Sequence, residues 1–103
     1  MVNTDRQLRT RLHQDYGATF ARFLFHGDEG ALAAAYELGR RSLERQVSLL
    51  DIVQIHHAVV IDALPGPEGP EELAEAGSVF LVEVLASFDM AQRALREQRD
   101  ATD

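Results

Sequence analysis

Two adjacent histidines, His56 and His57, are the first residues in this chain whose chemistry stands out. Neighbouring positions on a helix diverge by about 100°, so the two imidazoles cannot easily bind one metal ion. The HExxH pattern, which places two histidines on one helix face, is absent. A phosphoacceptor role for His57 would favour small or basic residues one turn later, where Val60 and Ile61 stand. We therefore expect His56 to be a structural histidine of the core or of its boundary, hydrogen-bonded to a carbonyl or a carboxylate.

The carboxylates and arginines form no catalytic pattern. Arg40 and Arg41 are expected to be solvated or bridged to Glu37 and Glu44, with Glu37 and Arg41 at the favourable i,i+4 spacing. Glu83 is expected either to be solvated or to pair with an arginine of a partner. The sequence contains no nucleophile–base pair, phosphate-cradling glycine loop or metal-ligand cluster. We expect no catalytic residue, no metal and no cofactor, and hence no enzyme within these residues.

Composition limits the remaining classes of protein. The chain has 103 residues, 46% of them hydrophobic, which suits one small globular domain. There is no cysteine, which excludes disulfide scaffolds and thiolate metal sites and fits a cytoplasmic protein. The formal net charge of −7 argues against nucleic acid as a partner. No apolar run reaches about 18 residues, so no membrane span is expected.

Helical periodicity predicts four helices, and residues suited to helix ends mark their limits. Thr4 and Gln7 have capping-box spacing, Gly27 suits a helix C-terminus, and Asp28 suits an N-cap. The expected helices span about 5–25, 29–46, 49–64 and 70–98. Each helix has an apolar stripe that is expected to face inward. In the first helix it consists of Leu8, Leu12, Tyr16, Phe20, Phe23 and Leu24, and in the second of Leu32, Ala35, Tyr36, Gly39 and Leu43. In the third helix it consists of Leu49, Ile52, Val53, His56, Val60 and Ala63, and in the fourth of Leu81, Val84, Phe88, Ala91 and Leu95.

Four helices with short connections predict an all-α fold, a small four-helix antiparallel bundle. Gly39 lies within an inward stripe, where its missing side chain would let another helix approach closely. Ser48, with Asp51 three residues later, is the expected N-cap of the third helix. Pro70 fits the first turn of the fourth helix.

The fourth helix carries a second apolar stripe on the side opposite its core stripe. A helix that is apolar on both sides must be covered on both sides. One interpretation is that the rest of this chain covers the second stripe. The other, which we favour because so small a domain has few residues to surround a helix, is a homodimer interface or a partner groove. The stripe consists of Val79, Val82, Ala86 and Met90.

Several motifs occur in an order that resembles a known family. They are an AxxxGR pattern at Ala35–Arg40, an ExQ pattern at Glu44–Gln46, a DIxxIH pattern at Asp51–His56, and an FLxEV pattern at Phe80–Val84. In this order they resemble the N-terminal domain of RsbU-type serine phosphatases, over about residues 16–92. Such domains are small helical bundles that dimerise and bind a switch kinase of the RsbT type. That binding activates a PP2C-type phosphatase domain, which dephosphorylates an anti-anti-sigma factor and so releases a stress sigma factor.

The resemblance implies that residues 1–103 are a single regulatory docking and dimerisation domain, with a phosphatase domain possible beyond residue 103. It implies a partner groove that includes Val82 and Glu83, with Ala86 one turn on and Ala33 at the border. The partner would be an RsbT-like switch kinase, another kinase or a downstream domain of the same protein.

Three alternatives stay open at the level of sequence. A free-standing adaptor would use the same surface without a phosphatase domain. A small-ligand sensor would hold its ligand near Tyr36 and His56, which both lie on expected inward stripes. A histidine phosphotransfer protein would use His57.

Overall fold

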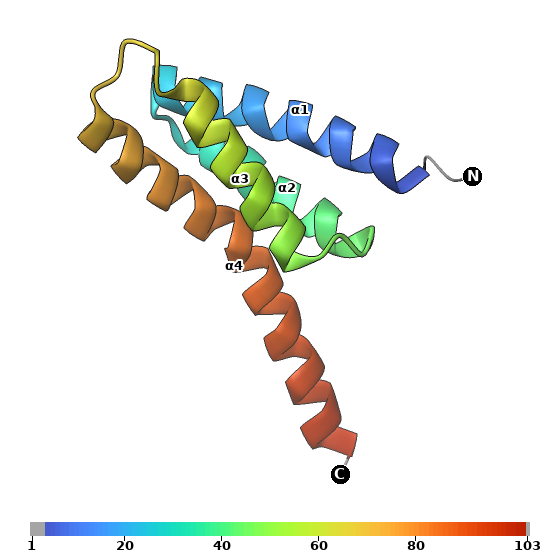
Figure 1. Cartoon of the computed structure of the whole chain (residues 1–103). Coiled ribbons are helices and arrows are strands. Elements are labelled where there is room, and N and C mark those ends of the chain that lie inside the picture. The colour runs from blue at the N-terminus through green and yellow to red at the C-terminus, as the bar shows by residue number, and fades with distance from the viewer. Residues whose placement is uncertain (1–3, 103) are drawn as a thin grey trace.

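The computed structural model describes the backbone of residues 4–102 and the side chains of residues 6–101. The chain folds into four helices, so the all-α bundle expected from the sequence is confirmed (Figure 1). The side chain of Thr4, expected to cap the first helix, lies outside the described residues. The helices are α1 (Thr4–His26), α2 (Glu29–Glu44), α3 (Leu49–Ala63) and α4 (Pro70–Thr102).

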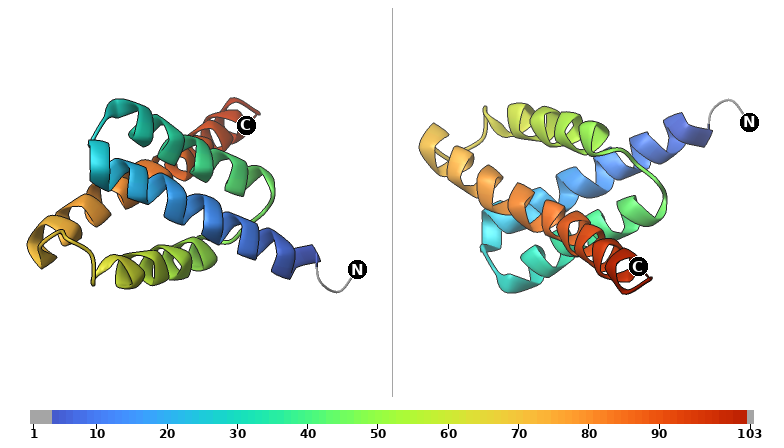
Figure 2. Two further views of the ribbon diagram at one scale, coloured as in Figure 1. Left: turned by 90° about the horizontal axis from the view of Figure 1, so that it is seen from above. Right: turned by 90° about the horizontal axis from the view of Figure 1, so that it is seen from below.

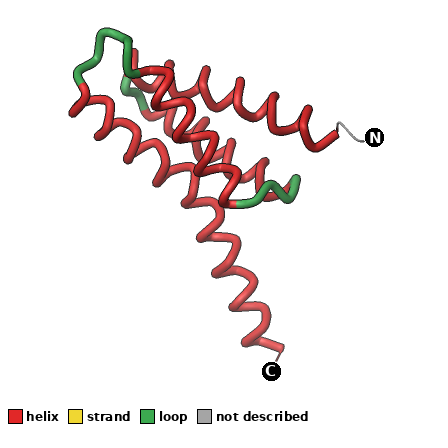
Figure 3. The backbone as a smooth tube through the Cα atoms, viewed as in Figure 1, coloured by secondary structure: helices red, strands yellow, loops and turns green. Residues whose placement is uncertain are grey.

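The connection between α1 and α2 reverses the chain within two residues (Figure 3). Gly27 has a φ of 59°, and its N–H donates to the carbonyl oxygen of Phe23 at 2.7 Å, which ends α1 in a left-handed cap. The side chain of Asp28 then accepts a hydrogen bond from the N–H of Ala31 at 2.8 Å. The cap residues expected here therefore close one helix and open the next.

The connection between α2 and α3 is a Schellman-type turn that uses glutamine in place of glycine. Gln46 has a φ of 62° and donates its N–H to the carbonyl of Leu43 at 3.0 Å. The N–H of Val47 donates to the carbonyl of Ser42 at 2.9 Å. Ser48 then caps α3 by accepting from the N–H of Asp51 at 3.1 Å.

Replacing Gln46 by glycine should stabilise the protein. A left-handed backbone conformation costs roughly 1–2 kcal/mol for a residue with a Cβ, whereas glycine adopts it freely. Glycine also loses more entropy on folding, so we expect a net gain of about 0.5–1 kcal/mol. Urea denaturation measures it. Gln46→Ala is the control, and equal stability of the two variants would contradict the assignment of strain to this turn.

The centre of the core is an aromatic cluster between α1 and α4. The ring of Phe80, which is fully buried, lies edge-on to Tyr16 and Phe20, with centroid distances of 5.1 and 5.2 Å. Ile52 and Val59 of α3 belong to the same buried core. Figure 2 shows α1, α3 and α4 around this region, with α2 beside α1 and against α4.

At Gly39 the backbones of α2 and α4 approach each other closely. A Cβ at this position would collide with the carbonyl oxygen of Val84 and with the Oγ of Ser87. The backbone of one helix thus lies directly on the other, as the glycine in the inward stripe predicted. Ser87 is itself buried, and its Oγ donates to the Val84 carbonyl at 3.0 Å.

The inward face expected for α3 is partly wrong. Leu49 and Val53 are more than 40% exposed, whereas Ile55 and Val59 are buried. The stripe is rotated because α3 has apolar residues around most of its circumference, so periodicity did not fix which side meets the core. On α2, Leu38 is buried although it was not expected to face inward.

Leu95, expected in the core stripe of α4, is 59% exposed. The C-terminal half of α4 extends past the other helices, which end before they could cover it (Figure 1). From residue 89 to residue 101, every side chain except that of Ala91 is exposed. The molecule measures 53 × 35 × 20 Å, elongated by this projecting helix.

Candidate functional site

The outer face of α4, formed by Val79, Val82, Ala86 and Met90, is not covered by the described part of the chain. Val82 is 67% exposed, Met90 54% and Val79 43%, while Ala86 is half-buried. Of the two interpretations of this stripe, coverage by the chain's own helices is therefore wrong for these side chains. An apolar stripe in contact with water is the usual mark of an interaction surface.

Glu83 and Ala33, the other predicted partner-facing residues, lie in different settings. Glu83 is half-buried and follows Val82 on the flank of the outer face. Ala33 is exposed on α2, and at 100° per residue it lies about 120° around that helix from Gly39, which faces α4. Glu83 is thus adjacent to the outer face of α4, whereas Ala33 points away from the α2–α4 contact.

Sequence reasoning missed a second exposed apolar surface, which runs along α3. It comprises five side chains that fall within an arc of about 120° on a helical projection. Leu50 is the most exposed at 67%. The available signal was that α3, like α4, has too many apolar residues for a helix with one buried side. The five are Leu49, Leu50, Val53, Ile61 and Leu64.

His56 joins α3 to the core through a buried hydroxyl. The Nδ1 atom of His56 and the Oη atom of Tyr16 are 2.7 Å apart, and Tyr16 is fully buried. The expected carbonyl or carboxylate partner is therefore wrong, while the half-buried position of His56 agrees with a histidine at the boundary of the core. Because burial lowers the pKa of His56, with a smaller effect of the same sign from His57, we assign it as neutral, with Nδ1 accepting the proton of Tyr16.

Acidification should weaken the fold through His56. Its pKa is lower in the folded state than in the unfolded chain, where it is about 6.5, so the unfolded state binds the proton more readily. The contribution of His56 to the free energy of unfolding is therefore fully present above about pH 6.5, and it declines as the pH falls from 6.5 towards the folded pKa. Urea titrations between pH 7 and pH 5 should show a decline that His56→Gln reduces and that His57→Gln retains. A His56→Gln variant with an unchanged slope would contradict this.

Arg40 is the hub of an ion-pair network on the surface of α2. Its guanidinium donates to Glu37 and, at 2.7 Å, to Glu44, and the hydrogen bond from Arg40 lowers the pKa of Glu37. The expected bridging of Glu37 and Glu44 is thus made by Arg40, whereas the expected ion pair between Glu37 and Arg41 is not formed. Arg41 instead lines a pocket together with residues of α1.

The ligand-sensor hypothesis gains no support from the positions of its residues. His56 contacts Tyr16 and Phe20, both on α1, whereas Tyr36 lies half-buried on α2. Among the described residues there is no group of three histidine, aspartate or glutamate side chains that could hold a metal ion. None of the described helices is both long enough and apolar enough to cross a membrane.

Comparison with known proteins identifies the family. The family described as phosphoserine phosphatase RsbU, N-terminal domain, matches residues 14–91. No curated protein and no solved structure gives a significant match. The family match includes α2 and α3 in full, just over half of α1 and the first two thirds of α4. Since the match covers well over half of the chain, this protein belongs to the family of RsbU N-terminal domains, which are regulatory rather than catalytic.

Proposed function

We propose that this domain regulates a partner-switching phosphatase of the RsbU type. In this proposal the domain forms a homodimer and docks an RsbT-like switch kinase. The pathway is a cytoplasmic stress response that controls a sigma factor. The observation that carries the proposal is the exposed outer face of α4, at Val79, Val82, Ala86 and Met90. Membership of the RsbU family supports the regulatory role. A downstream domain of the same protein is the alternative occupant of this face.

The chemistry of this face suits a protein partner. Val82 and Met90 present apolar side chains on a rigid helix, which loses little conformational entropy when a partner binds. Glu83, at the edge of the stripe, is placed to pair with an arginine or lysine at the rim of an interface. Such a charge at the rim favours specificity more than affinity.

Replacing Val82 by glutamate tests the surface directly. A carboxylate at a 67% exposed position leaves the fold intact but would be desolvated in an apolar interface. We expect at least tenfold weaker dimerisation or weaker capture of an RsbT-type kinase, which corresponds to about 1.4 kcal/mol or more. Light scattering measures the first and calorimetric titration with the kinase the second.

Gln92→Glu is the matched control, because it adds the same charge to an exposed position of α4 outside the stripe. A wild-type protein that is monomeric at tens of micromolar would refute the dimer. Kinase binding that is unaffected by Val82→Glu would refute the docking role of this face. Loss of helical signal in Val82→Glu would instead show that the stripe stabilises the fold.

A further inference from the structure

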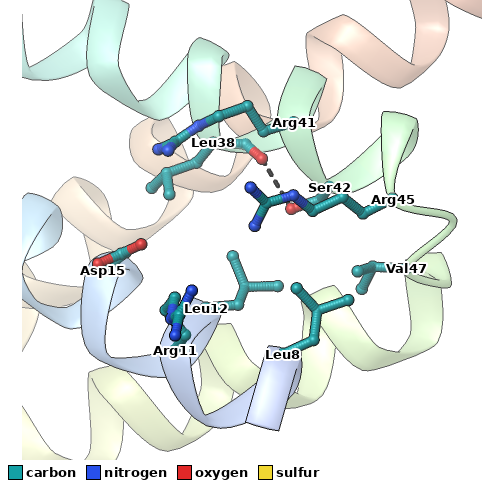
Figure 4. A pocket seen from close by; sticks show the side chains of 9 residues that line it. All are labelled: Leu8, Arg11, Leu12, Asp15, Leu38, Arg41, Ser42, Arg45 and Val47. Atoms are coloured by element: carbon teal, nitrogen blue, oxygen red, sulfur yellow. Dashed lines mark hydrogen bonds between the residues drawn. The ribbon is translucent and has the colours of Figure 1, made fainter. Parts of the chain in front are cut away.

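A pocket between the N-terminal half of α1 and the last turns of α2 gathers three arginines. Arg11, Arg41 and Arg45 all line it, and Figure 4 shows their side chains, with that of Asp15, around the space between the two helices. We refer to these four side chains and the space between them as the arginine pocket. Its lining is completed by Leu8, Leu12, Leu38, Ser42 and Val47.

Within the described residues the three arginines of the pocket form no ion pair, although the carboxylate of Glu37 acts on Arg41 at longer range. Other arginines of the chain form ion pairs, among them Arg9 with Asp51 and Arg40 with Glu37. None of the three that line the pocket pairs with a described carboxylate, and Asp15 lies beyond ion-pair distance of them. The three guanidinium groups and the one carboxylate that line the pocket together carry two net positive charges, in a chain whose formal net charge is −7.

The floor of the arginine pocket is apolar and rigid. Leu12, Leu38 and Val47 are buried, and the hydroxyl of Ser42 donates to the carbonyl of Leu38 at 2.7 Å. Electrostatic attraction is stronger above such a floor than in bulk water. The space available within the pocket is about 20 Å³. That volume holds about one water-sized atom, so only one oxygen of a bound group would enter while the others meet the guanidinium groups at the rim.

We propose that the arginine pocket binds the dianion of a phosphate monoester. A phosphate monoester carries about two negative charges at neutral pH, which match the two net positive charges of the pocket. Its three terminal oxygens allow one to point inward and two to accept from the exposed guanidinium groups, the geometry in which arginine binds phosphate best. A single carboxylate would neutralise only half of the charge. Two sources carry this group, a phosphorylated protein side chain and a free small molecule, and the experiment below distinguishes them.

The alternative role for two of these arginines is to stabilise their own helix. Arg41 and Arg45 lie at the C-terminal end of α2, where positive charge compensates the helix dipole. In that case their replacement would lower thermal stability without affecting any ligand. Arg11 lies inside α1, away from its C-terminal end, and does not compensate a helix dipole. An effect of replacing Arg11 on phosphate binding therefore supports ligand binding over helix stabilisation.

Calorimetric titration of the intact chain at low salt and pH 7.5 tests the proposal. The probes are inorganic phosphate, free phosphoserine, and a peptide that has one phosphoserine and no other charged side chain. The unphosphorylated form of the same peptide is titrated for comparison. We expect the phosphorylated probes to bind, and Arg41→Gln and Arg11→Gln each to weaken binding at least tenfold, the effect of losing one charged hydrogen bond. Asp15→Asn should strengthen binding severalfold, because it removes the opposing charge.

Arg93→Gln is the matched control, since this exposed arginine of α4 pairs with Asp89 and does not line the pocket. Tighter binding of the phosphopeptide than of free phosphoserine would identify a phosphoprotein as the source, and equal binding a small molecule. Affinity should also fall below about pH 6, where the phosphate monoester gains a proton. The proposal is overturned if no phosphorylated probe binds at millimolar concentration, if Arg93→Gln weakens binding equally, or if Asp15→Asn has no effect.

Discussion

Replacing Phe80 by alanine is expected to lower the free energy of unfolding by about 4 kcal/mol, the largest loss for any single truncation in this core. The ring is fully buried and contacts Tyr16 and Phe20 edge-on, with Phe23 at a centroid distance of 6.0 Å. Truncation removes these aromatic contacts and leaves a cavity between α1 and α4. Urea denaturation followed by circular dichroism, at one fixed protein concentration, measures the effect.

Phe25→Ala is the control for this experiment. Phe25 is 77% exposed at the end of α1, and its truncation should change stability by less than about 0.5 kcal/mol. A loss below about 1.5 kcal/mol for Phe80→Ala would mean that the cluster relaxes to fill the space, and would contradict the rigid core described above.

Gly39→Ala should lower the free energy of unfolding by about 3 kcal/mol, although it adds only one methyl group. The new Cβ meets the carbonyl of Val84, which belongs to the backbone of α4 and cannot rotate away as a side chain could. Either α2 and α4 separate, which exposes the surfaces they bury, or the clash persists. The same urea titration measures the loss.

Gly17→Ala is the matched control and should have the opposite sign. Gly17 lies inside α1, and a Cβ there would meet only Val59 Cγ2 at 3.9 Å, an ordinary contact. Alanine should therefore stabilise the helix by up to about 1 kcal/mol. If both glycine variants shift stability in the same direction, the close approach of α2 and α4 at Gly39 is refuted.

The helices and their caps were predictable because they depend on local sequence. Gly27, Asp28 and Ser48 act within a few residues of themselves, and their roles follow from backbone geometry. The inward faces of α3 and α4 were less predictable. Both helices have apolar residues on two sides, so the sequence alone does not tell whether Leu49 and Leu95 lie in the core or on the exposed side. Only the lengths and positions of the neighbouring helices decide which side is covered.

Contacts between distant segments could not be predicted in the same way. Tyr16 and His56 are 40 residues apart, and no local pattern pairs a tyrosine hydroxyl with a particular imidazole. The arginine pocket likewise exists only once α1 is placed beside α2, because Arg11 and Arg41 belong to separate helices. The outer face of α4 was different, because a single helix contains all of its residues and the periodicity showed it.

The contact at Gly39 also provides a point about which α4 could tilt as a rigid helix. From Val84, which lies against Gly39, the packed arm back to Pro70 is roughly 21 Å long and the projecting arm to the far end is roughly 27 Å, at 1.5 Å per residue. A tilt of α4 by about 10° around its contact with Gly39 would move the projecting end by roughly 5 Å, because the displacement grows with distance along a rigid helix. A small repacking beneath the first turns of α4, at Leu73 or Gly77, would thus be amplified at the opposite end of the molecule.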